Sequence, residues 1–127
     1  MTAAALVLIV DDAPDNREAY VEYLRFRGFR TLEAGTGGEA IALARSHHPD
    51  VILLDMRLPD IDGLEVSRLV RADPALRQSK IIAVSAAVFP ADVAAALASG
   101  CHVFLQKPCL PEALVAEIER LLEQTVM

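Results

Sequence analysis

A chain of 127 residues fits one compact domain, taken here as residues 1–127, and leaves no room for a second core of similar size. Hydrophobic residues make up 54% of the chain and charged residues 24%, which is typical of a globular protein and excludes global disorder. The formal net charge of −6, with no Lys/Arg cluster in the sequence, argues against direct binding of nucleic acid.

Five short apolar runs alternate with helical patterns, which predicts an α/β fold with a parallel sheet and crossover helices. The first strand is expected at 6–10, and Pro14 and Gly28 are expected to begin and end the helix that follows. The inward stripe of this helix is expected to consist of Asn16, Ala19, Tyr20, Tyr23 and Leu24. Val21 and Phe26 fall outside this stripe and hint at a docking surface for a partner protein.

The second strand is expected at 30–34, and Thr36 and Glu39 then have the spacing of a capping box for a helix that runs to about His47. The run 51–54 is apolar without alternation, as in a central strand covered on both faces. The remaining expected elements are a helix at 64–71, a strand at 81–84, a helix at 91–99, a strand at 103–106 and a final helix from Pro111 to about Leu122.

The sequence predicts neither a signal peptide nor a membrane-spanning segment. The apolar run 3–10 lacks a basic segment before it and stops at two aspartates, and no other stretch approaches the length of a span. Cys101 and Cys109 lie near opposite ends of one predicted strand, too far apart for a disulfide. We interpret them as the reduced thiols of a cytoplasmic protein.

Polar residues follow four of the predicted strands: Asp11 and Asp12, then Asp55, Ser85 and Lys107. Because a ligand crevice forms outside the carboxyl ends of a parallel sheet, these residues are expected to meet there. Three carboxylates repel one another, and a hard divalent cation, Mg²⁺ as the natural candidate, makes such a cluster tolerable. The cation, Lys107 and the Ser85 hydroxyl can then hold a phosphoryl group, with one carboxylate as the nucleophile.

Taken singly, most of these residues have a structural explanation. Asp11 and Asp12 can cap the first helix, Ser85 can be a strand-end hydroxyl and Lys107 a solvated charge. Asp55 closes a fully apolar strand and has no comparable structural role, so the joint placement favours a site. Other polar residues are interpreted as turn residues or as surface and loop histidines without a ligand role: Asp60, Asp62, His47, His48 and His102.

Four segments carry a resemblance to the receiver domains of response regulators: LIVDD at 8–12, DVILLDMRLPDIDG at 50–63, IIAVSA at 81–86 and FLQKP at 104–108. The resemblance implies a flavodoxin-like, doubly wound, five-stranded parallel sheet in the order 2-1-3-4-5, flanked by five helices. It also implies a cytoplasmic signalling switch of a two-component phosphorelay, which takes a phosphoryl group from a histidine kinase or histidine phosphotransfer protein in a Mg²⁺-dependent reaction. Such a domain catalyses its own phosphorylation and is not otherwise an enzyme.

The resemblance also implies a role for each site residue. Asp55 is the expected phosphoacceptor, Asp12 and Asp55 bind Mg²⁺ directly, Asp11 assists through water, and the backbone carbonyl of Arg57 completes the protein ligands. Lys107 and Ser85 are expected to contact the phosphoryl group. Ser85 and Phe104 form the expected switch toward an output face made of the fourth helix, fifth strand and fifth helix. This face is expected to bind a downstream protein target and offers a possible homodimer surface.

Two residues depart from the commoner family pattern, since Ser85 stands in place of threonine and Phe104 in place of tyrosine. Arg57 and Ala87 occupy positions where the family tunes phosphoryl lifetime. Two other functions stay open: a pseudo-receiver that keeps the fold without phosphorylation, and an aspartyl-phosphate hydrolase of the haloacid dehalogenase type. The hydrolase needs a second aspartate two residues after the nucleophile, where this chain has Arg57.

Overall fold

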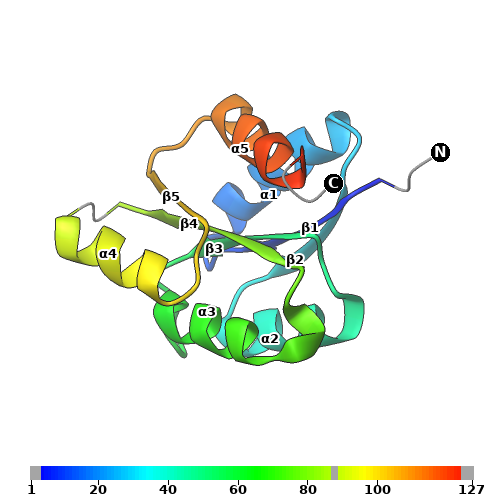
Figure 1. The fold of residues 1–127 in the computed structure, drawn as a ribbon. Helices are drawn as coiled ribbons and strands as arrows, with labels where there is room; N and C mark the ends of the chain where they lie inside the picture. The colour runs from blue at the N-terminus through cyan, green and yellow to red at the C-terminus, as the bar shows by residue number, and fades with distance from the viewer. Residues whose placement is uncertain (1–3, 87–88, 124–127) are drawn as a thin grey trace.

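The computed structural model describes residues 4–86 and 89–123, which leaves Ala87 outside the described residues. Within these ranges, five parallel strands form one sheet in the order β2-β1-β3-β4-β5, as expected (Figure 1). The strands are β1 (Leu6–Val10), β2 (Arg30–Ala34), β3 (Val51–Asp55), β4 (Lys80–Ser85) and β5 (Val103–Gln106). The helices are α1 (Pro14–Phe26), α2 (Gly37–His47), α3 (Gly63–Ala72), the short 3-10 helix η1 (Pro74–Leu76), α4 (Pro90–Ala98) and α5 (Pro111–Glu123).

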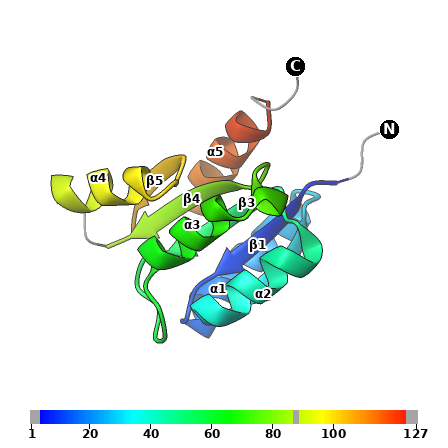
Figure 2. The ribbon, with the colours of Figure 1, turned by 60° about the horizontal axis from the view of Figure 1, so that its bottom comes forward.

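Helices cover both faces of the sheet, which makes the fold doubly wound (Figures 1 and 2). Helices α1 and α5 lie on one face, where Val21, Leu24 and Ile118 pack against alternate residues of the strands. The opposite face packs against side chains from α2, α3 and α4, among them Ala44, Val66 and Ala96. Every residue of β3 is buried, because this strand lies in the middle of the sheet with a helical layer on each side.

The expected start of α2 is confirmed, with one difference in its hydrogen bonds. The Thr36 hydroxyl accepts a hydrogen bond of 3.1 Å from the Glu39 amide, as a capping box requires. The Glu39 carboxylate accepts instead from the amide of Gly35, at 2.8 Å, rather than from that of Thr36. The first contact satisfies an amide of the first turn, which has no intrahelical acceptor, and the second joins the residue before the N-cap to that turn.

The inward stripe predicted for α1 is confirmed for Tyr20, Tyr23 and Leu24, but it wrongly includes Asn16 and Ala19 and omits Val21. Val21 is only 5% exposed, whereas Asn16 and Ala19 are exposed and Tyr20 and Tyr23 are partly buried. The buried stripe includes Leu24 and begins at Arg17, one residue later than predicted, since Arg17, Tyr20, Val21 and Leu24 have the i, i+3, i+4, i+7 spacing of one helix face. Val21 therefore belongs to the core and not to a docking surface. Phe26 is 81% exposed, as expected.

Both cysteines are free thiols, in agreement with the sequence. Cys101 is buried, and its burial raises the pKa of the thiol above its ordinary value. Cys109 is partly buried beside the start of α5. Among the described residues, no helix combines the length and the apolar composition that crossing a bilayer would require.

Candidate functional site

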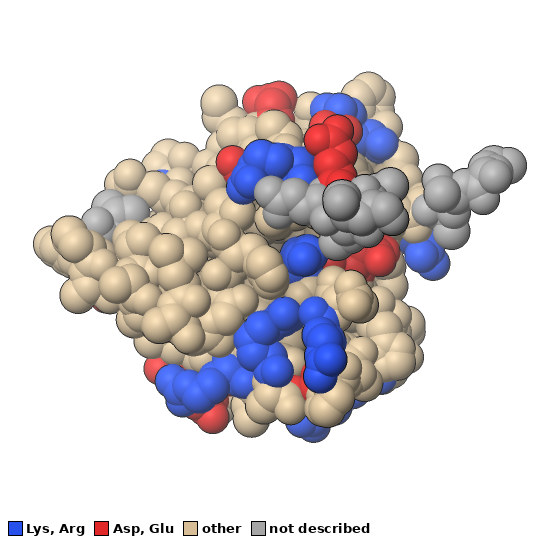
Figure 3. Space-filling view, viewed as in Figure 1, with Lys and Arg blue, Asp and Glu red and all other residues tan. Residues whose placement is uncertain are grey.

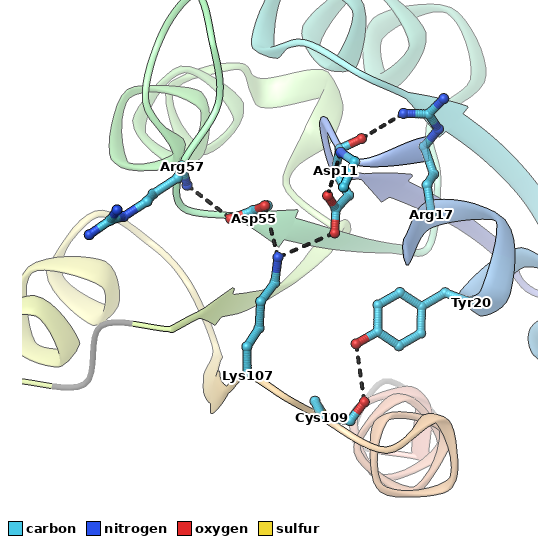
Figure 4. Close-up of polar contacts among 8 residues, drawn as sticks. Asp11, Arg17, Tyr20, Asp55, Arg57, Lys107 and Cys109 are labelled. Atoms are coloured by element: carbon cyan, nitrogen blue, oxygen red, sulfur yellow. Dashed lines mark hydrogen bonds and ion pairs between the residues drawn. The ribbon is translucent and has the colours of Figure 1, made fainter. Parts of the chain in front are cut away.

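The carboxyl edge of the sheet collects polar residues that the sequence singled out, and Figure 4 shows Asp11, Asp55 and Lys107 there. Asp11 directly follows β1, Asp55 is the last residue of β3, Ser85 is the last residue of β4, and Lys107 directly follows β5. The strands align these residues because β3 and β4 pair from Val51↔Lys80 to Asp55↔Val84, and β4 and β5 from Ile82↔Val103 to Ser85↔Gln106. Residues far apart in the sequence therefore share one mouth, as expected for this architecture.

Three carboxylates form a cluster at this edge. One oxygen from each of Asp11, Asp12 and Asp55 lies within 4.8 Å of the others. Asp11 and Asp55 are only 3% and 7% exposed, whereas Asp12 is exposed. Two of the three acidic side chains are therefore largely removed from water, which makes their mutual repulsion stronger than on a protein surface.

Lys107 supplies a positive charge to this cluster. Its Nζ donates to Asp55 Oδ2 at 3.0 Å and to Asp11 Oδ2 at 3.3 Å. Burial by itself lowers the pKa of Lys107, but the hydrogen bond and charge of Asp55, together with those of Asp11, outweigh it, so the pKa is raised above its ordinary value. The lysine is therefore held in its charged form and is not a solvated surface charge.

Backbone groups orient the two buried carboxylates. The Arg57 amide donates to Asp55 Oδ1 at 3.0 Å, and the Ala13 amide donates to Asp11 Oδ1 at 2.9 Å. Each carboxylate thus has one oxygen bound to an amide and the other facing Lys107. Helix α1 begins after Ala13 without a side-chain capping bond, so Asp11 and Asp12 do not cap it.

Ser85 and Phe104 lie beside the cluster on neighbouring strands. Ser85 is 4% exposed. Phe104, on β5, pairs with Ala83, which lies two residues before Ser85 on β4. The ring of Phe104 is partly buried and packs against the core layer under α4. Both residues line a hollow of about 180 Å³, together with Arg57 and Asp92. The two expected switch residues therefore face a common space.

Arg17 and Tyr20, on α1, also contribute to the site, although the sequence did not indicate it. The Arg17 guanidinium donates to the Asp11 carbonyl at 2.7 Å and to Glu33 at 3.1 Å, which fixes the end of β1 against β2. The Tyr20 hydroxyl donates to the Cys109 carbonyl at 3.1 Å, which ties the segment after Lys107 to α1 (Figure 4). A cavity of about 440 Å³ opens between these elements, with Tyr20 and Lys107 in its wall. Neither contact is encoded by a recognisable sequence motif.

Three other polar residues, which the sequence assigned to turns or loops, accept hydrogen bonds from backbone amides. Asp62 begins α3 by accepting a hydrogen bond of 3.0 Å from the Glu65 amide, so its role is structural. His102 Nδ1 accepts a hydrogen bond of 3.1 Å from the Ile81 amide, and burial lowers the pKa of its imidazole. Asp60 lies in the expected turn but also reaches α2, a contact that the sequence did not reveal.

Comparison with known proteins decides the family. Residues 7–119 match the response regulator receiver domain. The chain belongs to this family. As a receiver domain of two-component signalling it is a signalling switch, and the order of its strands agrees with the fold that the resemblance implied.

Individual relatives of this receiver domain support the assignment. The chain is 37% identical to the polar-differentiation response regulator DivK of Brucella ovis over 102 residues, which cover 80% of this chain and 83% of that protein. The solved structure of chemotaxis protein CheY4 of Vibrio cholerae is 30% identical, with a TM-score of 0.89 over 94% of this chain and 99% of that chain. The receiver domain of a histidine kinase from Syntrophus aciditrophicus is 31% identical, with a TM-score of 0.89 over 97% and 93%.

The receiver family binds Mg²⁺ at an acidic pocket, and the residues of this chain fit such an ion. Three carboxylates and the ammonium of Lys107 leave two negative charges at the edge of the sheet. Carboxylate oxygens are the ligands that hard divalent cations prefer, and a charge of two matches this excess. The position of the Arg57 carbonyl as a further ligand stays a prediction.

Proposed function

We propose that this receiver domain accepts a phosphoryl group on Asp55 from a histidine kinase or histidine phosphotransfer protein in the cytoplasm. The observation that carries the proposal is the ion pair between Lys107 Nζ and Asp55 Oδ2 at 3.0 Å. A lysine placed on the acceptor carboxylate lies where the oxygens of an incoming phosphoryl group gather negative charge. The neighbouring carboxylate of Asp12 is exposed, so this side of the cluster is the one that a phosphodonor can reach.

Asp12 and Asp55, the Arg57 carbonyl and, through water, Asp11 would hold Mg²⁺ in this proposal. The ion would supply positive charge to the phosphoryl oxygens during transfer. The exposed carboxylate of Asp12 leaves one side of the cluster open to solvent, where an ion can enter with part of its water shell. The buried carboxylates of Asp11 and Asp55 are already oriented by the amides of Ala13 and Arg57.

The transfer exchanges one bond to phosphorus for another. An oxygen of Asp55 forms the new P–O bond, the P–N bond of the donor phosphohistidine breaks, and the electron pair of that bond stays on the imidazole nitrogen. Lys107 and the Ser85 hydroxyl stabilise the phosphoryl oxygens, so the receiver itself provides the catalysis. The Arg57 amide holds the second oxygen of Asp55 and keeps the carboxylate oriented.

The signal is proposed to leave the site through Ser85 and Phe104 toward a face made of α4, β5 and α5, which binds a downstream protein or a second copy of the chain. The hollow shared by Ser85 and Phe104 gives the ring a space into which to move. Helix α4 carries Asp92 as its charged residue, and its outer surface is uncharged in Figure 3. An apolar surface of this kind favours a protein partner over a nucleic acid.

The proposal is tested by incubating the protein with Mg²⁺ and acetyl phosphate and measuring the intact mass. We expect a gain of one phosphoryl group that requires Mg²⁺ and disappears in Asp55→Asn. A chain that keeps its fold but never forms the adduct is a pseudo-receiver, and this result overturns the proposal. Steady hydrolysis of added phosphomonoesters would instead identify a hydrolase and would overturn it as well.

A further inference from the structure

The loop between β3 and α3, residues 56–62, is attached to the rest of the molecule at two points. At its base, the Gly63 amide donates to the Met56 carbonyl at 3.0 Å. At its tip, Asp60 Oδ1 accepts from the Gly37 amide at 2.8 Å, and Asp60 Oδ2 accepts from the Gly38 amide at 2.9 Å. The tip contact crosses from the loop after the phosphoacceptor strand to the amino end of α2, on a different part of the chain.

This contact is well matched in charge and geometry. Gly37 and Gly38 are the first residues of α2, where amides lack intrahelical acceptors and the helix dipole favours an anion. Hydrogen bonds from the amides of Gly38 and Gly37 lower the pKa of Asp60 to about 2, so the carboxylate is ionised at neutral pH. Both carboxylate oxygens of Asp60, an exposed residue, therefore accept hydrogen bonds from the amino end of α2.

Steric fit shows that the loop lies directly on α2. A Cβ atom at Gly37 would meet Ile61 Cγ1 at 2.4 Å and Val66 Cγ2 at 3.0 Å. Glycine is therefore required at this position if Ile61, the neighbour of Asp60, is to pack against the helix start. The polar contact of Asp60 and the apolar contact of Ile61 together hold the loop tip.

We propose that Asp60 is a positioning residue for the Mg²⁺ site. The inference rests on the proposed function, because the loop that Asp60 holds also carries Arg57. The Arg57 amide orients Asp55, and its carbonyl is an expected Mg²⁺ ligand. Groups that fix the ligands of a metal from outside the coordination shell commonly change its affinity when they are removed. Asp60 thus acts on the ion through Arg57 without touching it.

The contact itself is tested without metal or phosphodonor, by measuring amide hydrogen exchange by NMR. In Asp60→Ala we expect the amides of Gly37 and Gly38 to exchange faster by on the order of tenfold, since each loses a bond to a charged acceptor. The Arg57 amide is expected to exchange faster as well, because the loop tip is released. Asp73→Ala, which removes a carboxylate from the amide of Ala75 at the start of η1, controls for general destabilisation. Unchanged exchange at Arg57 in Asp60→Ala overturns the proposal.

The consequence for the ion is tested by calorimetric titration with Mg²⁺. We expect Asp60→Ala to bind Mg²⁺ weaker by on the order of tenfold, as for other groups that support a metal's ligands. Asp60→Asn keeps one acceptor oxygen and should lose less affinity than Asp60→Ala. Asp62→Asn removes the same charge from the same loop and should stay close to the wild type.

Two outcomes of the titration overturn the inference: equal losses in Asp60→Asn and Asp60→Ala, or an equal loss in Asp62→Asn. Either result would assign the effect to charge and not to the contact with α2. Failure of the proposed function would look different. In that case the wild type would not acquire a phosphoryl group, while amide exchange and the Mg²⁺ titration would still show a larger change in Asp60→Ala than in the control variants.

Discussion

The main-chain amide of Lys107 donates a hydrogen bond of 2.9 Å to the main-chain carbonyl of Ser85. This bond continues the pairing of β4 and β5 by one step beyond the sheet register, which ends at Ser85↔Gln106. The two side chains proposed to hold the phosphoryl group therefore leave adjacent strands at points joined by the backbone. Their relative position is a property of the sheet and does not depend on a flexible loop.

Ser85→Ala should separate phosphorylation from switching. Loss of the hydroxyl removes one bond to a charged phosphoryl oxygen, so we expect phosphorylation by acetyl phosphate to slow by roughly tenfold. The NMR signals of the Phe104 ring should then respond less to a beryllofluoride mimic than in the wild type. Ser85→Thr, which restores the hydroxyl, is the matched control. A full ring response in Ser85→Ala would show that the coupling does not pass through this hydroxyl.

Lys107→Met should have opposite effects on the ion and on phosphorylation. A unit charge at 4 Å contributes about 1 kcal/mol even in water, so removal of the ammonium should strengthen Mg²⁺ binding by about fivefold. Phosphorylation should become slower, because the phosphoryl oxygens lose their contact with Lys107. Calorimetry and mass measurement test the two halves separately. Weaker binding of Mg²⁺ by Lys107→Met would contradict the electrostatic account.

The titration of Lys107 should depend on Asp55. The pKa of Lys107 is raised above 10.5 because Asp55 and Asp11 outweigh the effect of burial. The stabilisation from this ion pair is therefore complete below 10.5 and declines as the pH rises through the higher pKa of the folded state. In Asp55→Asn the pKa should fall, as monitored by NMR of the lysine side chain between pH 8 and 12. An unchanged titration would show that Asp11 alone accounts for the shift.

Gly63→Ala should disturb β3, the strand that ends at the proposed phosphoacceptor Asp55. An added Cβ would lie 2.7 Å from Met56 Cα and 2.9 Å from the Asp55 carbonyl, so backbone has to move. We expect a loss of about 1–3 kcal/mol in the free energy of unfolding and slower phosphorylation. Gly35→Ala is the control for the free energy of unfolding, because the atom nearest to its Cβ is the side-chain Nη1 of Arg17, at 3.2 Å, and no backbone has to move. Equal urea midpoints for the two variants would contradict the steric argument.

Two substitutions in α1 test the corrected register of that helix. Val21 is 5% exposed and Phe26 is 81% exposed. Val21→Ala should reduce the free energy of unfolding by about 2 kcal/mol, since it removes buried methyl groups and leaves a cavity. Phe26→Ala should change it by less than about 0.5 kcal/mol. Urea unfolding distinguishes the cases. A loss for Val21→Ala as small as that for Phe26→Ala would support the register predicted from the sequence, which leaves both residues outside the inward stripe.

The strands could be predicted closely because their signals are local. The runs at 6–10, 30–34 and 103–106 agree with β1, β2 and β5, and 51–54 falls one residue short of the end of β3. The buried face of α1 could not be predicted as well, since Asn16 and Ala19 have helical spacing with Tyr20 and Tyr23 and yet are exposed. Burial of Val21 is decided by the packing of α1 on the sheet and on α5, which the local pattern does not contain.

The main residues of the site were predictable because topology brings the ends of parallel strands together. Contacts of Asp60 and Tyr20 were not, because each joins segments with no sequence pattern linking them. Asp60 bonds to Gly37 over 23 positions, and Tyr20 bonds to Cys109 over 89. The local sequence around Asp60 indicates a turn but does not indicate that Asp60 contacts the amino end of α2. Such partners become visible only when the loops are placed in three dimensions.

The ion pair between Lys107 and Asp11 joins residues 96 positions apart. During synthesis, all three carboxylates of the cluster are made well before the lysine that partly neutralises them. Until β5 pairs with β4, the acidic cluster of a nascent chain lacks the charge of Lys107. Repulsion among the three carboxylates then opposes their approach to one another. A chain that still lacks β5 therefore also lacks the cation on which the proposed phosphoacceptor site depends.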